Sequence, residues 1–150
     1  IGYAAGPKEL IKAMGKVQSQ STSNTSSISQ AAAVEALNGN QDFISERSNA
    51  FKKRRDFVVS SLNNIKGLSC IKPNGAFYVF PNCKKLLNKK TKLKTDADFV
   101  EQLLIKANVA VVQGSAFGLD GYFRISYATS MEKLKVAMDR IKTFCENLNN

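Results

Sequence analysis

The stretch GSAFGLDGYFRISYA, residues 114–128, decides the fold of the C-terminal half of the chain. Its glycines predict a turn, and the residues that follow predict a short strand. Because side chains alternate along a strand, Phe123, Ile125 and Tyr127 lie on one face and Arg124 lies on the other. The apolar face belongs to the core, so Arg124 is expected on the outer face of a sheet.

Arg124 is suited to binding an anion. Its guanidinium group presents a fixed fork of N–H donors that can hold a carboxylate through two parallel hydrogen bonds, each worth roughly 1.5–3 kcal/mol when charged. Two simpler interpretations are an exposed strand arginine and an arginine paired with a nearby aspartate. The stretch alone leaves these alternatives open.

The composition limits the kind of protein and its chemistry. A chain of 150 residues suits one domain, or one domain with a piece of another, and 43% hydrophobic residues without a bilayer-length apolar run favour a globular protein outside the membrane. The absence of histidine excludes Ser-His-Asp and Cys-His catalysis and histidine-bound metals. The three cysteines match no disulfide framework or zinc motif, so we expect reduced thiols, no metal site and a cytoplasmic location.

A formal net charge of +10 raises the alternative of a basic polyanion-binding module. The excess is concentrated in two clusters, at residues 52–55 and 84–94. Neither cluster contains interleaved aromatic residues of the kind that stack on bases. A solvated lysine-rich loop is the simpler explanation, so no nucleic-acid or membrane partner is expected.

Apolar residues at helical spacing predict five helices. They cover residues 7–17, a segment from about Ile28 to Asn38, a long helix that begins at Asp42 and runs for more than twenty residues, a helix from Thr95 or Asp96 to Ala107, and residues 131–148. The polar tract at 18–27 is typical of a flexible linker whose last serines cap the second helix.

Short apolar or alternating runs predict the strands. They occupy residues 1–6, 68–72, 76–80 and 109–112, in addition to the strand of the opening stretch. A buried strand at residues 1–6 would lack neighbours in this chain, so we expect the chain to be a fragment of a larger protein. From residue 42 onward the pattern predicts an α+β sandwich, with helices on one side of a mixed or antiparallel sheet.

Three motifs in order resemble the C-terminal part of class I pyridoxal-phosphate aminotransferases, and among these the bacterial aspartate aminotransferases. They are IGYAAGPKEL at residues 1–10, PNGAFY at 73–78 and the block at 114–128. The resemblance covers the whole chain and implies the α/β fold of type I pyridoxal-phosphate transferases. It also implies that residues 1–41 are the tail of the large domain, 42–66 a long interdomain helix and 67–150 the small α+β domain.

The resemblance further implies roles for particular residues. Arg124 matches the arginine that binds the substrate α-carboxylate, and Phe77 matches a segment at the substrate entrance, although a plain core position is the alternative for Phe77. Asn24 lies in a segment that faces the partner subunit of a homodimer. Gln113 and Thr25 stand where many members have proline, which brings into question the local loop geometry.

The implied reaction transfers the amino group of aspartate to 2-oxoglutarate, giving oxaloacetate and glutamate, with pyridoxal 5'-phosphate as cofactor. The family's Schiff-base lysine and phosphate-binding arginine would precede Ile1, so no catalytic or cofactor-binding residue is expected in this chain. The isolated chain is therefore expected to be inactive. Aromatic or prephenate-type substrates remain open, as does a regulatory small-molecule domain that uses Arg124 without catalysis.

Overall fold

The computed structural model describes residues 1–149 and divides into two compact units. The first is Ile1–Ile44 and the second begins at Ser45, so the division falls within the first turn of the long helix α3 (Asp42–Asn63). The assignment of residues 1–41, 42–66 and 67–150 to parts of a two-domain enzyme remains a prediction.

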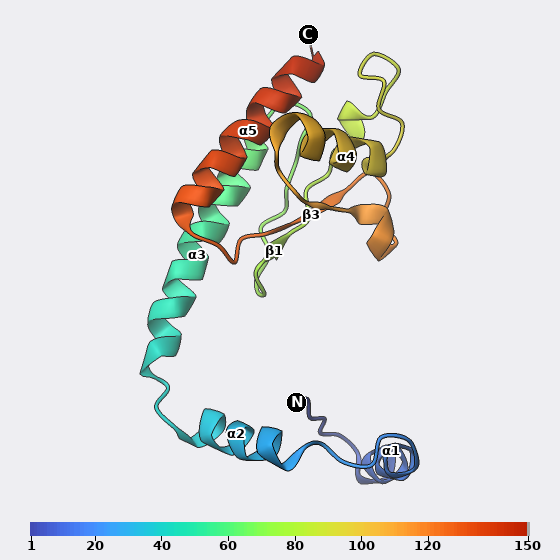
Figure 1. The fold of residues 1–150 in the computed structure, drawn as a ribbon, viewed down its shortest axis with the longest axis vertical. Coiled ribbons are helices and arrows are strands. Elements are labelled where there is room, and N and C mark those ends of the chain that lie inside the picture. The colour runs from blue at the N-terminus through green and yellow to red at the C-terminus, as the bar shows by residue number, and fades with distance from the viewer. Residues whose placement is uncertain (150) are drawn as a thin grey trace. The chain divides into compact units, whose positions relative to one another are not determined.

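The first unit consists of helices α1 (Lys8–Ser21) and α2 (Ser27–Asn38) (Figure 1). Neither helix has a buried residue within the described chain, and the apolar stripe of α1 is exposed. Helix α1 runs four residues beyond its predicted end, so the first part of the polar tract is helical and only residues 22–26 connect the two helices. Ser26 occupies the N-cap position of α2, but its side chain forms no capping hydrogen bond.

The strand predicted for residues 1–6 is absent, and these residues are exposed. A strand needs a neighbouring strand for its backbone N–H and C=O groups. None of the described residues supplies one to this segment, which agrees with the expectation that such a strand would lack neighbours in this chain.

The second unit contains the remaining part of α3 together with α4 (Asp96–Ala107) and α5 (Met131–Asn149). The predicted start and end of α4 are confirmed. The Thr95 hydroxyl accepts a hydrogen bond from the Asp98 amide, and the Asp98 carboxylate accepts one from the Thr95 amide, which forms a capping box. Asn108 ends the helix in the left-handed conformation.

The sheet of the second unit is antiparallel with the order β1-β3-β2. Its strands are β1 (Tyr78–Val79), β2 (Val112–Gln113) and β3 (Phe123–Ser126). Tyr78 pairs with Ser126, and Val112 pairs with Arg124. Two short 3-10 helices accompany the strands, η1 (Lys84–Leu86) and η2 (Gly114–Phe117).

The strands are shorter than the apolar runs that predicted them. Between residues 68 and 72 only Ser69 forms a bridge, to Asn82. The backbone of Cys70 is instead bonded in both directions by the Asn63 side chain, at 2.8 and 2.9 Å, which replaces a strand partner. Ala76 has a positive φ of 58°, so extended structure cannot begin before Phe77.

The run at residues 109–112 is mostly not a strand either. Val109 is buried, as predicted, but Ala110 and Val112 are exposed. Pairing is confined to Val112 and Gln113, opposite Arg124 and Phe123 of β3.

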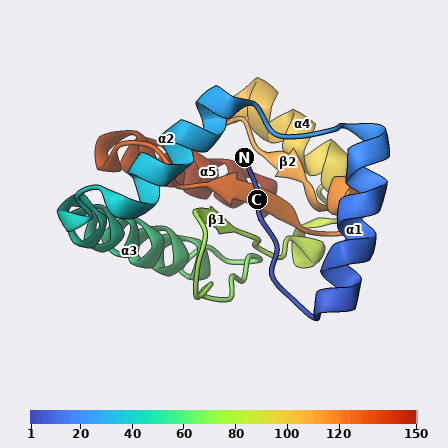
Figure 2. The same ribbon diagram turned by 90° about the horizontal axis from the view of Figure 1, so that it is seen from below.

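The core lies on the predicted face of β3, where Phe123, Ile125 and Tyr127 are buried. Phe99 of α4 is fully buried, with its ring centroid 5.0 Å from that of Phe123 and 5.6 Å from that of Phe144 on α5. Helix α4 also contacts β2 (Figure 2). The expected α+β arrangement is therefore confirmed as an antiparallel sheet packed against helices.

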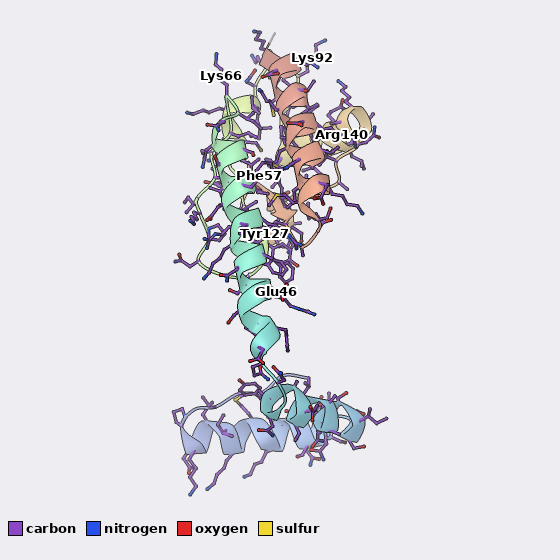
Figure 3. All side chains as sticks on the ribbon, turned by 90° about the vertical axis from the view of Figure 1, so that its left-hand side faces the viewer. Glu46, Phe57, Lys66, Lys92, Tyr127 and Arg140 are labelled. Carbon is purple, nitrogen blue, oxygen red and sulfur yellow. The ribbon has the colours of Figure 1, made fainter. Side chains whose placement is uncertain are left out.

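Helices α3 and α5 run side by side over this core (Figures 1 and 3). The buried residues of α3 are Val58, Val59 and Leu62, all in its C-terminal half. Glu46, near the start of the helix, is exposed (Figure 3). The long helix is thus anchored to the second unit by its C-terminal half.

Candidate functional site

Arg124 projects from the outer face of β3, and its guanidinium group lies between two aromatic rings. The guanidinium carbon is 4.4 Å from the ring centroid of Tyr78 on β1 and 4.3 Å from that of Phe117 in η2. Within residues 1–149 its side chain forms no ion pair or hydrogen bond. The alternative of pairing with a nearby aspartate is therefore not observed.

This arrangement fixes the guanidinium without using its N–H donors. Aromatic faces attract the cation by about 0.5–2 kcal/mol per ring, depending on solvent exposure. The donors lie in the guanidinium plane and remain available to a ligand at the edge of the group. Such a group is prepared to bind a carboxylate by two parallel hydrogen bonds.

Phe117 belongs to a row of aromatic side chains on the same outer face. Phe80 meets Phe117 edge-on with ring centroids 6.0 Å apart, and stacks on Tyr122 at 5.7 Å. The Lys84 ammonium lies 5.2 Å from the Tyr122 ring centroid. These contacts restrain the ring that covers Arg124.

The glycines of the opening stretch close a tight loop that presents Phe117. The Gly114 amide donates to the Tyr122 carbonyl at 2.7 Å, and the Leu119 amide donates to the Gly114 carbonyl at 3.1 Å. A Cβ atom on Gly114 would lie 2.7 Å from the Tyr122 carbonyl oxygen, which leaves no room for a side chain. Gly118 ends η2 with a φ of 78°, where glycine is favoured.

Gln113 enters this loop with a φ of −61°. This is the value that a proline ring imposes, so glutamine keeps the backbone that proline would have in its place. The φ at position 113 is therefore one that proline could also adopt.

Asp96 anchors the same loop from the core side. Its carboxylate accepts hydrogen bonds from the Ser115 amide at 2.8 Å and from the Gly121 amide at 3.4 Å. The residue is only 3% exposed. Burial raises the pKa of the Asp96 carboxyl, but the hydrogen bonds from Ser115 and Gly121 outweigh burial and hold the pKa below its ordinary value.

The lowered pKa predicts how acid affects this loop. A carboxyl with a depressed folded-state pKa stabilises the fold fully above its ordinary value of 3.8, and this contribution is lost as the pH falls through the lower folded-state pKa. Asp96→Asn should therefore cost roughly 1.5–3 kcal/mol of unfolding free energy at about pH 7, and less at about pH 3. Urea unfolding of both proteins at the two pH values measures the difference. A gap that is constant or widens in acid would contradict this.

Phe77 lies next to Tyr78 and begins the segment that leads into β1. Its ring centroid is 4.5 Å from that of Tyr78 and 6.4 Å from that of Phe51 on α3. At 40% exposure, Phe77 is not a core residue. It borders a cavity of about 300 Å³ whose lining includes Lys52, Arg55 and Gly75.

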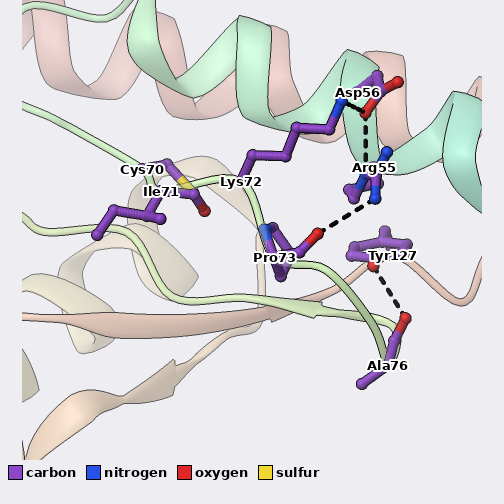
Figure 4. A network of polar contacts seen from close by, with 8 residues as sticks. All are labelled: Arg55, Asp56, Cys70, Ile71, Lys72, Pro73, Ala76 and Tyr127. Carbon is purple, nitrogen blue, oxygen red and sulfur yellow. Dashed lines mark hydrogen bonds and ion pairs between the residues drawn. The ribbon is translucent and has the colours of Figure 1, made fainter.

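The turn before Phe77 is held by hydrogen bonds to its carbonyl groups (Figure 4). The Tyr127 hydroxyl donates to the Ala76 carbonyl at 2.9 Å, and Arg55 donates to the Pro73 carbonyl at 3.2 Å. Arg55 is in turn bonded to Asp56, which also pairs with Lys72, each at 2.9 Å. The hydrogen bond from Lys72 lowers the pKa of Asp56 most, and the hydrogen bond from Arg55 lowers it further. Helix α3 and Tyr127, the residue directly after β3, therefore fix the turn from two sides.

Tyr127→Phe should measure how much the Tyr127 hydroxyl contributes to the stability of the fold through its hydrogen bond to this turn. The substitution keeps the buried ring and removes only the bond to the Ala76 carbonyl, so we expect a loss of about 1 kcal/mol of unfolding free energy. Urea denaturation measures this loss, with Tyr122→Phe on the outer face as the matched control. Equal stability of Tyr127→Phe and the unsubstituted protein would contradict the expectation.

The structure thus brings two of the three predicted site residues together. Arg124 and Phe77 both contact the ring of Tyr78. Asn24 lies in the first unit, between α1 and α2, where it is exposed and borders a hollow with Thr25. The sequence did not single out Asp96 or the two rings beside Arg124. Tyr78 was considered only as part of a predicted strand, and Asp96 only as a possible start of its helix.

The remaining polar and basic groups form no second centre in the described chain. Residues 1–149 contain no group of three or more acidic, cysteine or histidine side chains placed to hold a metal ion. The three cysteines are buried and none forms a disulfide within the described chain, and burial raises the pKa of the Cys83 and Cys145 thiols to about 12. The lysines of residues 84–94 are all exposed.

None of the described helices has the length and apolar character needed to cross a membrane.

Comparison with known proteins gives consistent results over nearly the whole chain. The family model described as aminotransferase class I and II matches residues 1–141. The chain is 59% identical to the aspartate aminotransferase of Rhizobium meliloti (strain 1021), covering 99% of this chain and 37% of the relative. It is 56% identical to the probable aspartate/prephenate aminotransferase of Rickettsia typhi, covering 99% of this chain and 38% of the relative.

Solved structures show the same similarity. The crystal structure of the Rhizobium meliloti aspartate aminotransferase matches 97% of this chain with a TM-score of 0.86 and 59% identity, over 37% of its own length. A mutant of the Thermus thermophilus aspartate aminotransferase matches 95% of this chain with a TM-score of 0.82 and 39% identity, over 38% of its own length. The chain therefore spans a little over a third of the proteins it resembles.

Proposed function

The chain belongs to the class I and II aminotransferase family, and from this premise we propose that it forms the C-terminal part of an aspartate aminotransferase. Arg124 then binds the α-carboxylate of the amino-acid or 2-oxo-acid substrate. The observation that supports this most is the guanidinium held between Tyr78 and Phe117 with its donors unused by the described chain.

In this role Arg124 acts by positioning the substrate. Two parallel hydrogen bonds fix both the place and the plane of the carboxylate, which a single point charge cannot do. Fixing one end of a small substrate orients its α-carbon for reaction and removes the entropy cost of orienting it during the chemical step. The aromatic rings beside the guanidinium limit its own motion and so preserve this geometry.

Class I aminotransferases use pyridoxal 5'-phosphate, which supplies the electron sink for amino-group transfer when bound. The described part of this chain does not fit the covalent attachment of that cofactor, because every one of its lysines is exposed. We assign the attachment lysine and the phosphate-binding residues to parts of the protein outside this chain. The contribution of residues 1–149 is to the substrate.

The names of the relatives support a choice of substrates. Proteins called aspartate aminotransferase and aspartate/prephenate aminotransferase are both more than half identical to this chain. We therefore propose that the full-length protein converts aspartate and 2-oxoglutarate to oxaloacetate and glutamate, with prephenate as an alternative acceptor. Phe77 would line the substrate entrance beside Arg124, and Asn24 would face the partner subunit of a homodimer. The buried cysteine thiols, none of which forms a disulfide within the described chain, suit a cytoplasmic enzyme.

An assay of the purified full-length protein tests this proposal. With aspartate and 2-oxoglutarate it should form oxaloacetate and glutamate in equal amounts, and replacing 2-oxoglutarate by prephenate measures the breadth of the acceptor site. Failure to transfer the amino group of aspartate to either acceptor would contradict the proposed substrate.

A further inference from the structure

Asp96 is a buried charged residue that lies behind the Arg124 site without touching it. Among the residues that the structure describes, Asp96 is the one charged residue whose side chain is buried. A carboxylate removed from water costs several kcal/mol unless hydrogen bonds compensate for the lost solvation. The buried position of the Asp96 carboxylate therefore needs a structural or functional explanation.

Helix capping is not that reason. The N-terminus of α4 is already capped by Thr95 and Asp98, which exchange hydrogen bonds with each other's backbone. The carboxylate of Asp96 turns away from this box toward the loop at residues 114–121. Helix α4 packs against both η2 and β2, so it provides a firm base for that contact.

The two hydrogen bonds of Asp96 hold both ends of the loop. The Ser115 amide near its start donates to Oδ2, and the Gly121 amide at its end donates to Oδ1. Phe117, which covers the Arg124 guanidinium, lies between these two points in the sequence. The far end is held further by Cys83, whose amide donates to the Gly121 carbonyl at 2.9 Å.

We propose that Asp96 is a positioning residue that holds the 114–121 loop so that Phe117 keeps the Arg124 guanidinium turned toward the substrate carboxylate. This inference rests on the proposed function of Arg124. It assigns a role in substrate binding to a residue that itself contacts neither the substrate nor Arg124.

Replacement by asparagine is a suitable test because it is nearly isosteric. The two amide donors use different oxygens of Asp96, whereas an asparagine side chain has only one acceptor oxygen. Asp96→Asn therefore leaves one loop amide facing an NH₂ group and releases one end of the loop. Asp98→Asn is the matched control, because Asp98 also accepts two backbone hydrogen bonds at the start of α4 but does not bond to the loop.

The measurement is calorimetric binding of succinate, an unreactive dicarboxylate, to the full-length protein with its cofactor bound. We expect the succinate Kd to rise about tenfold in Asp96→Asn and less than about twofold in Asp98→Asn, corresponding to the loss of one charge-assisted hydrogen bond in the loop. Equal weakening in both variants, or no weakening in Asp96→Asn, would overturn the inference.

Phe117→Ala is a second variant that tests the proposal. It does not alter a buried residue, since Phe117 is 48% exposed. It should weaken succinate binding severalfold, and combining it with Asp96→Asn should add little if Asp96 acts through Phe117. Unchanged binding in Phe117→Ala, or fully additive effects, would count against the proposal even if Asp96→Asn failed to fold.

Arg124→Lys separates this inference from the proposed function. If Arg124→Lys weakens succinate binding and Asp96→Asn does not, Arg124 binds the substrate and the positioning role of Asp96 is wrong. If Arg124→Lys leaves succinate binding unchanged, the proposed function of Arg124 itself fails.

Discussion

Arg124→Lys in the full-length protein is expected to lower kcat/KM for aspartate about 10- to 100-fold. Lysine keeps the positive charge but loses the planar pair of donors, so one charge-assisted hydrogen bond to the carboxylate is lost. Such a bond is worth roughly 1.5–3 kcal/mol, and about 1.4 kcal/mol corresponds to a factor of ten. Steady-state kinetics with aspartate and 2-oxoglutarate measure the loss, which should include a higher KM for both substrates.

Arg140→Lys is the control for this substitution. Arg140 is an exposed arginine of α5 that donates to the Asn108 carbonyl at 3.3 Å, so its replacement should leave kcat/KM within about twofold of the unsubstituted protein. If Arg124→Lys behaves like Arg140→Lys, Arg124 does not bind the substrate.

The isolated 150-residue chain is expected to show no transaminase turnover and no covalent cofactor adduct. The reason is that all lysines of the described chain are exposed, whereas attachment of the cofactor needs a lysine inside an enclosed site that lowers its pKa. The assay combines the chain with pyridoxal 5'-phosphate, aspartate and 2-oxoglutarate, and it treats a second sample with borohydride to trap adducts. The full-length protein is the positive control.

Mass spectrometry of the trapped sample shows which outcome holds. Substoichiometric labelling spread over several lysines is the result we expect of exposed amines. A stoichiometric adduct at a single lysine of this chain would show that residues 1–150 contain a cofactor site.

Helices were predicted well because their signals are local. The start of α4 at Thr95 or Asp96 and the apolar residues of α5 are each indicated within a few turns of sequence, and both predictions are confirmed. Strands depend on partners elsewhere in the chain, so apolar runs alone overstated them. The residues that shortened them act over a distance, as when the Asn63 side chain bonds the Cys70 backbone in place of a neighbouring strand.

The candidate site also combines features that local sequence predicts with features that depend on distant residues. Alternation along β3 was sufficient to place Arg124 opposite the buried Phe123. Its two ring contacts depend on strand register and on the path of the glycine loop, which the sequence does not specify. The hydrogen bonds that Asp96 accepts come from residues 19 and 25 positions away, and no local pattern indicates them. The sequence therefore indicated which residue could bind a carboxylate, but not which distant residues contact and position it.

A crystal structure of the full-length protein with succinate tests the central claim most directly. The account predicts that one carboxylate lies edge-on to the Arg124 guanidinium, with two N···O distances of about 2.7–2.9 Å, while Tyr78 and Phe117 still cover its faces. A succinate bound elsewhere, or bound without any contact to Arg124, would contradict it.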